Sequence, residues 1–92
     1  MTERQSFIIK TLFYYENHGK TTDGYHEVLQ DAPSADVTFM RQLIENGYVC
    51  AYQARSKGCG LPCFMFAGFT PQGCTAYASY FRDLTTTLTN RH

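Results

Sequence analysis

The segment Phe69-Thr70-Pro71-Gln72-Gly73 sets the firmest constraint on the fold, because the chain changes character across it. The residues just before it, CFMFAGF, are aromatic and apolar, which is typical of a strand. Threonine is a favoured helix N-cap, and proline is well tolerated at the first helical position, where its missing N–H costs nothing. A strand therefore ends at Phe69 and a helix begins at once, which predicts a chain of mixed α and β structure.

A stripe of apolar side chains at helical spacing predicts a first helix over residues 4–17. The stripe consists of Ile8, Leu12 and Tyr15, with Ile9 and Phe13 beside it. The next segment is short, and apolar residues at positions 25, 28 and 29 suggest a two-turn helix. We expect this second helix to start at Thr22 or Asp23 and to end before Pro33.

Residues 34–46 again carry apolar side chains at helical spacing and predict a third helix. We expect Ser34 to be its N-cap and Asp36 to suit its positively polarised first turn. Beyond Gly47, the segments YVCAYQAR and CFMFAGF are rich in β-branched and aromatic residues, with a glycine-containing turn between them. They predict an antiparallel hairpin over residues 48–69, followed by a last helix.

This order of elements resembles a winged helix–turn–helix domain. Gly47-Tyr48-Val49 stands where many members close the third helix, and Phe69–Gly73 matches their Leu-Thr-x-x-Gly motif with Phe in place of Leu. In length and layout, residues 4–82 resemble small prophage-type, YjcQ-like winged-helix proteins. The resemblance implies one α+β domain over residues 1–83, with three helices, a two-stranded β-hairpin wing and a C-terminal helix; residues 84–92 are its end or a tail.

A DNA-binding winged helix lays its third helix in the major groove and its wing on the backbone. The residues of this chain at those places are Thr38, Arg41, Gln42 and Glu45 on the helix and Arg55 and Lys57 at the wing tip, where we expect no acid nearby. Thr38, Arg41 and Gln42 have side chains that can read bases. For any single one of them, however, we favour the simpler interpretation of an ordinary solvated helix face.

The charge distribution opposes contact with phosphates. The whole chain has eight basic and eight acidic residues, but residues 19–47 hold two basic and five acidic ones, a net charge of −3 (2 − 5). Such a surface repels DNA instead of releasing its counterions. We therefore expect a protein partner, which complementary charged patches would orient, and keep sequence-specific binding of double-stranded DNA as the alternative. The resemblance implies a phage-type regulator or inhibitor of a host complex.

The four cysteines allow three interpretations. Cys50, Cys59, Cys63 and Cys74 could bind a structural zinc ion, or Cys59 and Cys63 could form a reversible disulfide. We favour a third, in which Cys50 and Cys74 are small core residues and Cys59 and Cys63 are reduced loop thiols, because no C-x-x-C pair is present. No metal and no cofactor is therefore expected.

Other classes of function find little support in the sequence. His18, His26 and His92 are scattered, and no glycine-rich phosphate loop follows a strand, so we expect no catalysis. No stretch approaches the ~20 apolar residues of a membrane span, and the charged start MTERQSFIIK makes a poor signal peptide. We expect a cytoplasmic protein without membrane contact.

The last helix carries a seam of heptad type. Its members are Cys74, Tyr77, Phe81, Leu84 and Leu88. Because Leu84 and Leu88 extend beyond what one small domain covers, we expect a homodimer with Tyr77, Phe81, Leu84 and Leu88 at the interface. The alternative is a disordered tail after Asp83.

Overall fold

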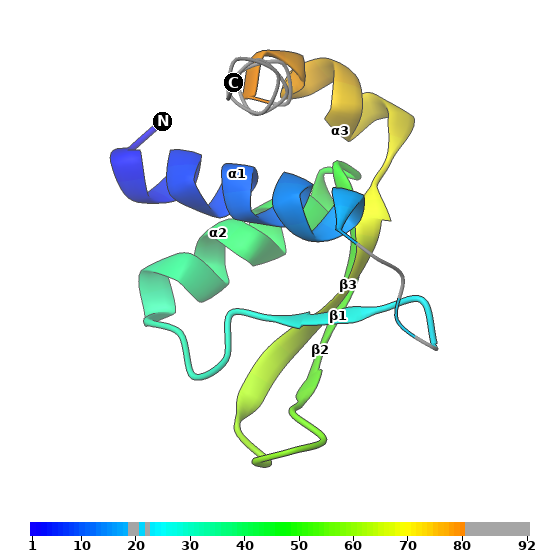
Figure 1. Cartoon of the computed structure of the whole chain (residues 1–92). Coiled ribbons are helices and arrows are strands. Elements are labelled where there is room, and N and C mark those ends of the chain that lie inside the picture. The colour runs from blue at the N-terminus through cyan, green and yellow to red at the C-terminus, as the bar shows by residue number, and fades with distance from the viewer. Residues whose placement is uncertain (19–20, 22, 81–92) are drawn as a thin grey trace, which may run out of the picture.

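The computed structural model of the chain describes residues 1–18, 21 and 23–80. It has an α+β fold in which two helices cover one face of a small antiparallel sheet and a further helix follows the last strand (Figure 1). The elements in chain order are helix α1 (Glu3–Asn17), strand β1 (His26–Val28), helix α2 (Ser34–Glu45), strands β2 (Val49–Arg55) and β3 (Pro62–Phe69), and helix α3 (Pro71–Ala76). In the part of the chain that the structure describes, none of the helices is both long and apolar enough to span a membrane.

The sheet has the strand order β1-β3-β2, so β3 lies in the middle and pairs antiparallel on both sides. Val28 of β1 lies opposite Phe64 of β3, and both side chains are buried. β2 pairs with β3 from end to end, with a β-bulge between Cys50 and Ala51. β3 therefore buries side chains on both faces, whereas β2 is an edge strand.

The core lies between the two helices and the sheet. Phe13 of α1 stacks on Phe69 at the end of β3, with ring centroids 4.0 Å apart and an interplanar angle of 10°. The buried side chains of this core cluster are Ile8, Ile9, Leu12, Phe13, Val28, Phe39, Met40, Leu43, Val49, Phe64, Phe66 and Phe69. Each large apolar side chain buried here contributes about 1.5–3 kcal/mol, and together they hold α2 against the hairpin.

The predicted helices over 4–17 and 34–46 and the predicted hairpin over 48–69 are confirmed as α1, α2 and the β2–β3 pair. α1 also begins with a capping box. The Thr2 hydroxyl accepts a hydrogen bond from the Gln5 backbone N–H, and the Gln5 side chain accepts one from the Thr2 N–H. These bonds satisfy backbone donors that the first helical turn leaves without partners.

The predicted short helix between Thr22 or Asp23 and Pro33 is wrong, because strand β1 lies in this segment. Leu29 and Asp31 have φ angles of 55° and 48°, which a right-handed helix excludes. A two-turn helix has little stability by itself, so this segment pairs with the central strand β3 instead. The sheet consequently has three strands instead of the two expected for the hairpin alone.

The start of α2 also differs from the expectation. Pro33 occupies the N-cap position, Ser34 is the first helical residue, and no side chain caps the helix. Asp36 lies in the first turn as expected, but it is buried. Its Oδ2 atom accepts hydrogen bonds from Nε and Nη2 of Arg4 at 3.1 and 2.8 Å, which ties α1 to α2.

The glycine that ends α2 forms a Schellman motif. Gly47 has a φ angle of 75°, a conformation that glycine adopts without steric cost. Its N–H donates to the Ile44 carbonyl at 3.0 Å, and the Tyr48 N–H donates to the Leu43 carbonyl at 2.9 Å. These two bonds are those of the Schellman motif and explain why the chain reverses here into β2.

The start of α3 packs directly on that motif. Thr70 is the N-cap and Pro71 the first helical residue, as predicted. The Thr70 hydroxyl accepts from the Gly73 N–H at 3.0 Å and donates to the Gly47 carbonyl at 2.6 Å, while the Thr70 N–H donates to the Tyr48 carbonyl at 3.0 Å. The two short motifs behind the sequence resemblance therefore meet at one place, which we call the Thr70 junction.

α3 is interrupted within the predicted seam. It ends at Ala76, Tyr77 is a turn residue that packs on Tyr48 and Phe69, and residues 78–80 are again helical. Cys74, expected to be buried, is exposed. The remaining seam residues, Phe81, Leu84 and Leu88, and the proposed boundary at residue 83 lie outside the described residues.

Candidate functional site

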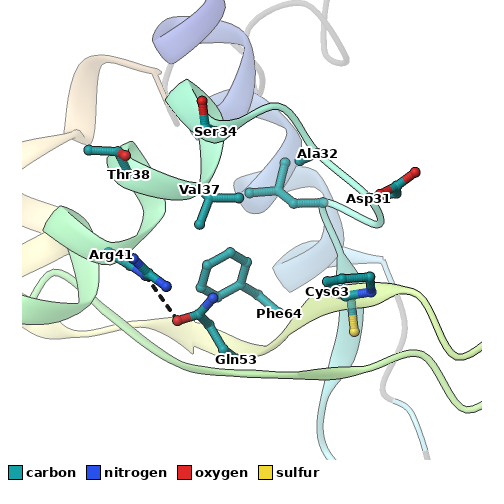
Figure 2. Close-up of a pocket in the computed structure, with 11 residues that line it drawn as sticks. Asp31, Ala32, Ser34, Val37, Thr38, Arg41, Gln53, Cys63 and Phe64 are labelled. Atoms are coloured by element: carbon teal, nitrogen blue, oxygen red, sulfur yellow. Dashed lines mark hydrogen bonds between the residues drawn. The ribbon is translucent and has the colours of Figure 1, made fainter.

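A groove of about 380 Å³ opens between α2, the hairpin and the loop that joins β1 to α2 (Figure 2). Its walls come from three parts of the chain that are distant in sequence. The lining residues are Leu29, Asp31 and Ala32 from the loop, Ser34, Val37, Thr38 and Arg41 from α2, and Gln53, Pro62, Cys63 and Phe64 from the hairpin. The segment where we expected a helix thus forms one wall of an open cleft.

The floor of the groove is apolar and its rim is polar. Val37 points from α2 towards the ring of Phe64, which lies on the central strand (Figure 2). Ser34, Thr38 and Arg41 share a helix face with Val37 because residues three and four apart are neighbours on a helix. The groove therefore offers a small apolar surface beside hydroxyl groups and one cation.

Arg41 is held across the groove by β2. Its Nε atom donates a hydrogen bond of 2.9 Å to Oε1 of Gln53 (Figure 2). This neutral acceptor orients the guanidinium group without neutralising its charge. Arg41 therefore remains a positive group fixed at the rim of the groove.

The loop wall has an unusual backbone. Leu29 and Asp31 both adopt left-handed φ angles, a conformation that costs a branched residue such as leucine about 1–2 kcal/mol. The Asp31 N–H donates to the Pro62 carbonyl at 2.8 Å, which fixes the loop to the hairpin. Strain of this kind often accompanies functional surfaces.

The structure brings together only some of the predicted contact residues. Thr38 and Arg41 line the groove, whereas Gln42 and Glu45 are exposed on α2 away from its lining. Arg55 lies further along the hairpin, where its Nη1 atom donates to the Gly60 carbonyl at 2.9 Å. Lys57 lies near the opposite face of the sheet.

The expectation that Lys57 has no acid nearby is wrong. Its Nζ atom forms an ion pair with Oδ2 of Asp23 at 3.0 Å, and its backbone N–H donates to Oε1 of Glu27 at 2.8 Å. Glu27 also accepts a hydrogen bond from the Ser56 hydroxyl at 2.9 Å. Lys57 thus connects the hairpin turn to the segment around β1. The contact could not be predicted from a local pattern, because Lys57 and its partners are about thirty residues apart in sequence.

These bonds make stability depend on pH. Hydrogen bonds from the Lys57 ammonium group, the Tyr25 N–H and the Thr21 hydroxyl lower the pKa of Asp23 from 3.8 to about 2, and the bonds from the Lys57 N–H and the Ser56 hydroxyl lower the pKa of Glu27 below its ordinary 4.5. Because both folded-state pKa values are lowered, this stabilisation is complete above the unfolded-state values and is lost as the pH falls from about 4.5 towards 2.

We expect the urea midpoint to fall over this range in the wild-type protein and to fall less in Lys57→Met. Lys10→Met, which removes an exposed lysine from α1, is the matched control and should behave as the wild type does. Equal acid sensitivity in Lys57→Met and the wild type would show that the ion pair between Lys57 and Asp23 does not contribute.

The charges of the predicted helix–turn–helix region are partly compensated from outside it. Asp36 is paired with Arg4 and Asp23 with Lys57, so two of the five acids in residues 19–47 have cationic partners beyond that window. The second pair also places a carboxylate beside Lys57 in the hairpin turn. On α2 itself, Arg41 is the sole basic residue beside two acids, Asp36 and Glu45.

The interpretation of the cysteines is partly corrected. All four are free thiols, but Cys63 is the buried one, while Cys50, Cys59 and Cys74 are exposed. Cys63 lies on the central strand, whose two faces are both covered, and burial raises the pKa of its thiol. Among residues 1–18, 21 and 23–80, no three His, Cys, Asp or Glu side chains lie close enough together to hold a metal ion.

Sequence reasoning missed two parts of the groove. Gln53 was not singled out, although its alternation with Ala51 along β2 places it on the side that faces α2. The loop wall was missed because a helix was expected in that segment.

Comparisons of the chain with protein-family models, curated proteins and solved structures gave no match.

Proposed function

We propose that the chain is a small, non-catalytic winged-helix module that acts by binding a protein, as a phage-type regulator or inhibitor of a host complex. The observation that carries this proposal is the groove beside α2: an apolar floor, a rim of hydroxyl groups and one oriented cation. Protein contact sites combine apolar anchor pockets with a polar rim in this way.

The composition of α2 argues for protein over DNA. A duplex presents one negative charge per ~1.7 Å, and binding gains from each phosphate that a cation neutralises. α2 has one cation, Arg41, and two acids, of which Asp36 is buried and paired with Arg4 and Glu45 is exposed; Lys57 is paired with Asp23. An apolar cleft has no evident role in phosphate contact, whereas it can receive an apolar side chain of a partner.

The winged-helix assignment draws on the order of α1, α2, the hairpin and α3, and on the Thr70 junction, where the two motifs behind the resemblance pack together. Strand β1 stands where the second helix of such a domain was expected. DNA binding stays the second candidate because Thr38, Arg41 and Gln42 are exposed side by side on α2 and have base-reading chemistry.

Capture of partners from a nuclease-treated lysate of the source cell tests the proposal. The immobilised wild-type protein should retain a defined protein, and Arg41→Glu should reduce its recovery at least tenfold. Lys10→Glu reverses an exposed charge on α1 and should leave recovery unchanged. Recovery that disappears with nuclease, or that is equal in Arg41→Glu and the wild type, would contradict protein binding through the groove.

A homodimer through the last helix is a separate prediction. Burying Leu84 and Leu88 against a second copy would contribute about 1.5–3 kcal/mol for each side chain. We expect sedimentation equilibrium to show a dimer at tens of micromolar and a monomer for the double variant Leu84→Asp/Leu88→Asp. A monomeric wild-type protein, or a dimer unaffected by both substitutions, would exclude this interface.

A further inference from the structure

The outer edge of β2 carries backbone groups that the sheet leaves unpaired. Hydrogen-bonded and non-hydrogen-bonded pairs alternate along an antiparallel ladder. The Ser56 N–H donates to the Leu61 carbonyl, whereas the Pro62 carbonyl faces the other way and accepts from Asp31. Counting back along β2 from Ser56, this alternation directs the N–H and C=O groups of Ala54 and Tyr52 towards β3.

The groups of Ala51, Gln53 and Arg55 therefore point outwards. Within the described part of the chain, the N–H groups of these three residues have no hydrogen-bond partner in the protein. They form a row of three donors and three acceptors along one edge of the sheet.

This edge lacks most of the features that protect natural edge strands. β2 is seven residues long, contains no proline, and has Arg55 as its only charged residue. Short length, proline and inward-pointing charges are the usual means of preventing strand addition. The bulge at Cys50 and Ala51 interrupts only its first part. Five consecutive residues, 51–55, remain regular and have half-buried or exposed side chains.

Two cations lie along the same side of this edge. Arg41 reaches β2 at Gln53, and Arg55 follows two residues later, so alternation places both on the side of the sheet that faces α2. Both guanidinium groups bond to neutral oxygens, those of Gln53 and Gly60. A strand added beside β2 would thus meet one positive charge beside Gln53 and another at Arg55, two residues further on.

We propose that the edge of β2 binds an extended segment of the partner protein that carries acidic residues at alternate positions. The segment adds a fourth strand to the sheet through the backbone groups of Ala51, Gln53 and Arg55, and its carboxylates face Arg41 and Arg55. This inference rests on the proposed function, and it specifies the chemistry and the conformation of the partner.

A second copy of this chain fits the edge less well. β2 carries Arg55 and no acid, so a neighbouring β2 offers no carboxylate to either arginine. An antiparallel two-fold pairing centred on Tyr52 would also bring the two copies of Arg41 towards each other. Like charges facing across an interface oppose association.

NMR hydrogen exchange with a synthetic peptide tests the proposal. The probe is a seven-residue peptide in which three glutamates alternate with valine and threonine, added at millimolar concentration to the isotope-labelled full chain. Binding should slow exchange of the Ala51, Gln53 and Arg55 amides and leave those of Tyr52 and Ala54, which are already bonded to β3, little changed. The same peptide with glutamine for glutamate should bind more weakly, and N-methylation at alternate residues should abolish the protection.

Variants of the protein separate the charge from the backbone. Arg41→Gln and Arg55→Gln should each weaken the peptide on the order of two- to fivefold, as expected for exposed ion pairs, whereas Lys10→Gln should have no effect. Unchanged exchange of the three edge amides, equal binding of the glutamine peptide, or new dimerisation of the chain in place of peptide binding would overturn the inference. The capture experiment with Arg41→Glu and Lys10→Glu tests the proposed function independently. Failure of the peptide to bind would exclude strand addition at β2 but not protein binding, and failure of the capture experiment would exclude protein binding through the groove.

Discussion

Replacing Gly73 with alanine should lower the free energy of unfolding by about 3 kcal/mol, the upper end of the usual cost of overpacking. A Cβ atom at this position would lie 1.9 Å from the carbonyl oxygen of Tyr48 and 3.1 Å from the ring of Phe69. The Tyr48 carbonyl is backbone and already accepts the Thr70 N–H, so it cannot move without opening the Thr70 junction. The gain in helix propensity, up to about 1 kcal/mol, is too small to offset this clash.

Thermal and urea unfolding measure the effect, which corresponds to a decrease in Tm of about 12 °C or more. Gly58→Ala is the matched control, because the nearest atom to its Cβ would be the Ser56 hydroxyl oxygen at 4.0 Å. The control should stay within about 0.5 kcal/mol of the wild type. Similar stabilities for the two variants would show that α3 does not pack on Tyr48 as described.

Replacing Arg4 with methionine should lower the free energy of unfolding, because it leaves a buried carboxylate without its charged hydrogen-bond donor. The side chain of Asp36 is only 5% exposed, and Arg4 supplies both of the hydrogen bonds that its Oδ2 atom accepts. Arg4 is itself about half exposed, which keeps the expected cost below that of a fully buried pair. The loss comes from the carboxylate left behind in the interface between α1 and α2.

A double-mutant cycle isolates this effect. Arg4→Met/Asp36→Leu removes both charges and should recover at least half of the stability lost in Arg4→Met, because no buried carboxylate remains. The cycle is measured by urea unfolding at pH 7. A double variant less stable than Arg4→Met would mean that Asp36 stabilises α2 by another route, such as its place in the first turn.

Much of the fold could be predicted from local patterns. α1 and α2 have buried faces at helical spacing, and the residues that end α2 and begin α3 have strong turn and cap preferences, so their positions follow from short segments. The segment around β1 could not be predicted in this way. Its three residues form a strand because Phe64 and Phe66 of β3 lie beside them, and that pairing partner is more than thirty residues away.

The candidate site shows the same limit. Thr38 and Arg41 were found because they share the exposed face of one helix. The groove beside them depends on Gln53 and on the left-handed backbone at Leu29 and Asp31, neither of which a periodic pattern reveals. Lys57 was misjudged for a related reason, since its partner Asp23 comes from a different part of the chain.

Selection from a random pool of duplex DNA at physiological salt is the most direct test of the claim that α2 and its groove serve a protein partner. The account predicts no enriched sequence and only weak binding that falls steeply with added salt, near the non-specific level of about 10⁻⁴–10⁻⁶ M. An enriched sequence bound at nanomolar affinity, with binding lost in Arg41→Ala or Gln42→Ala and kept in Lys10→Ala, would contradict it.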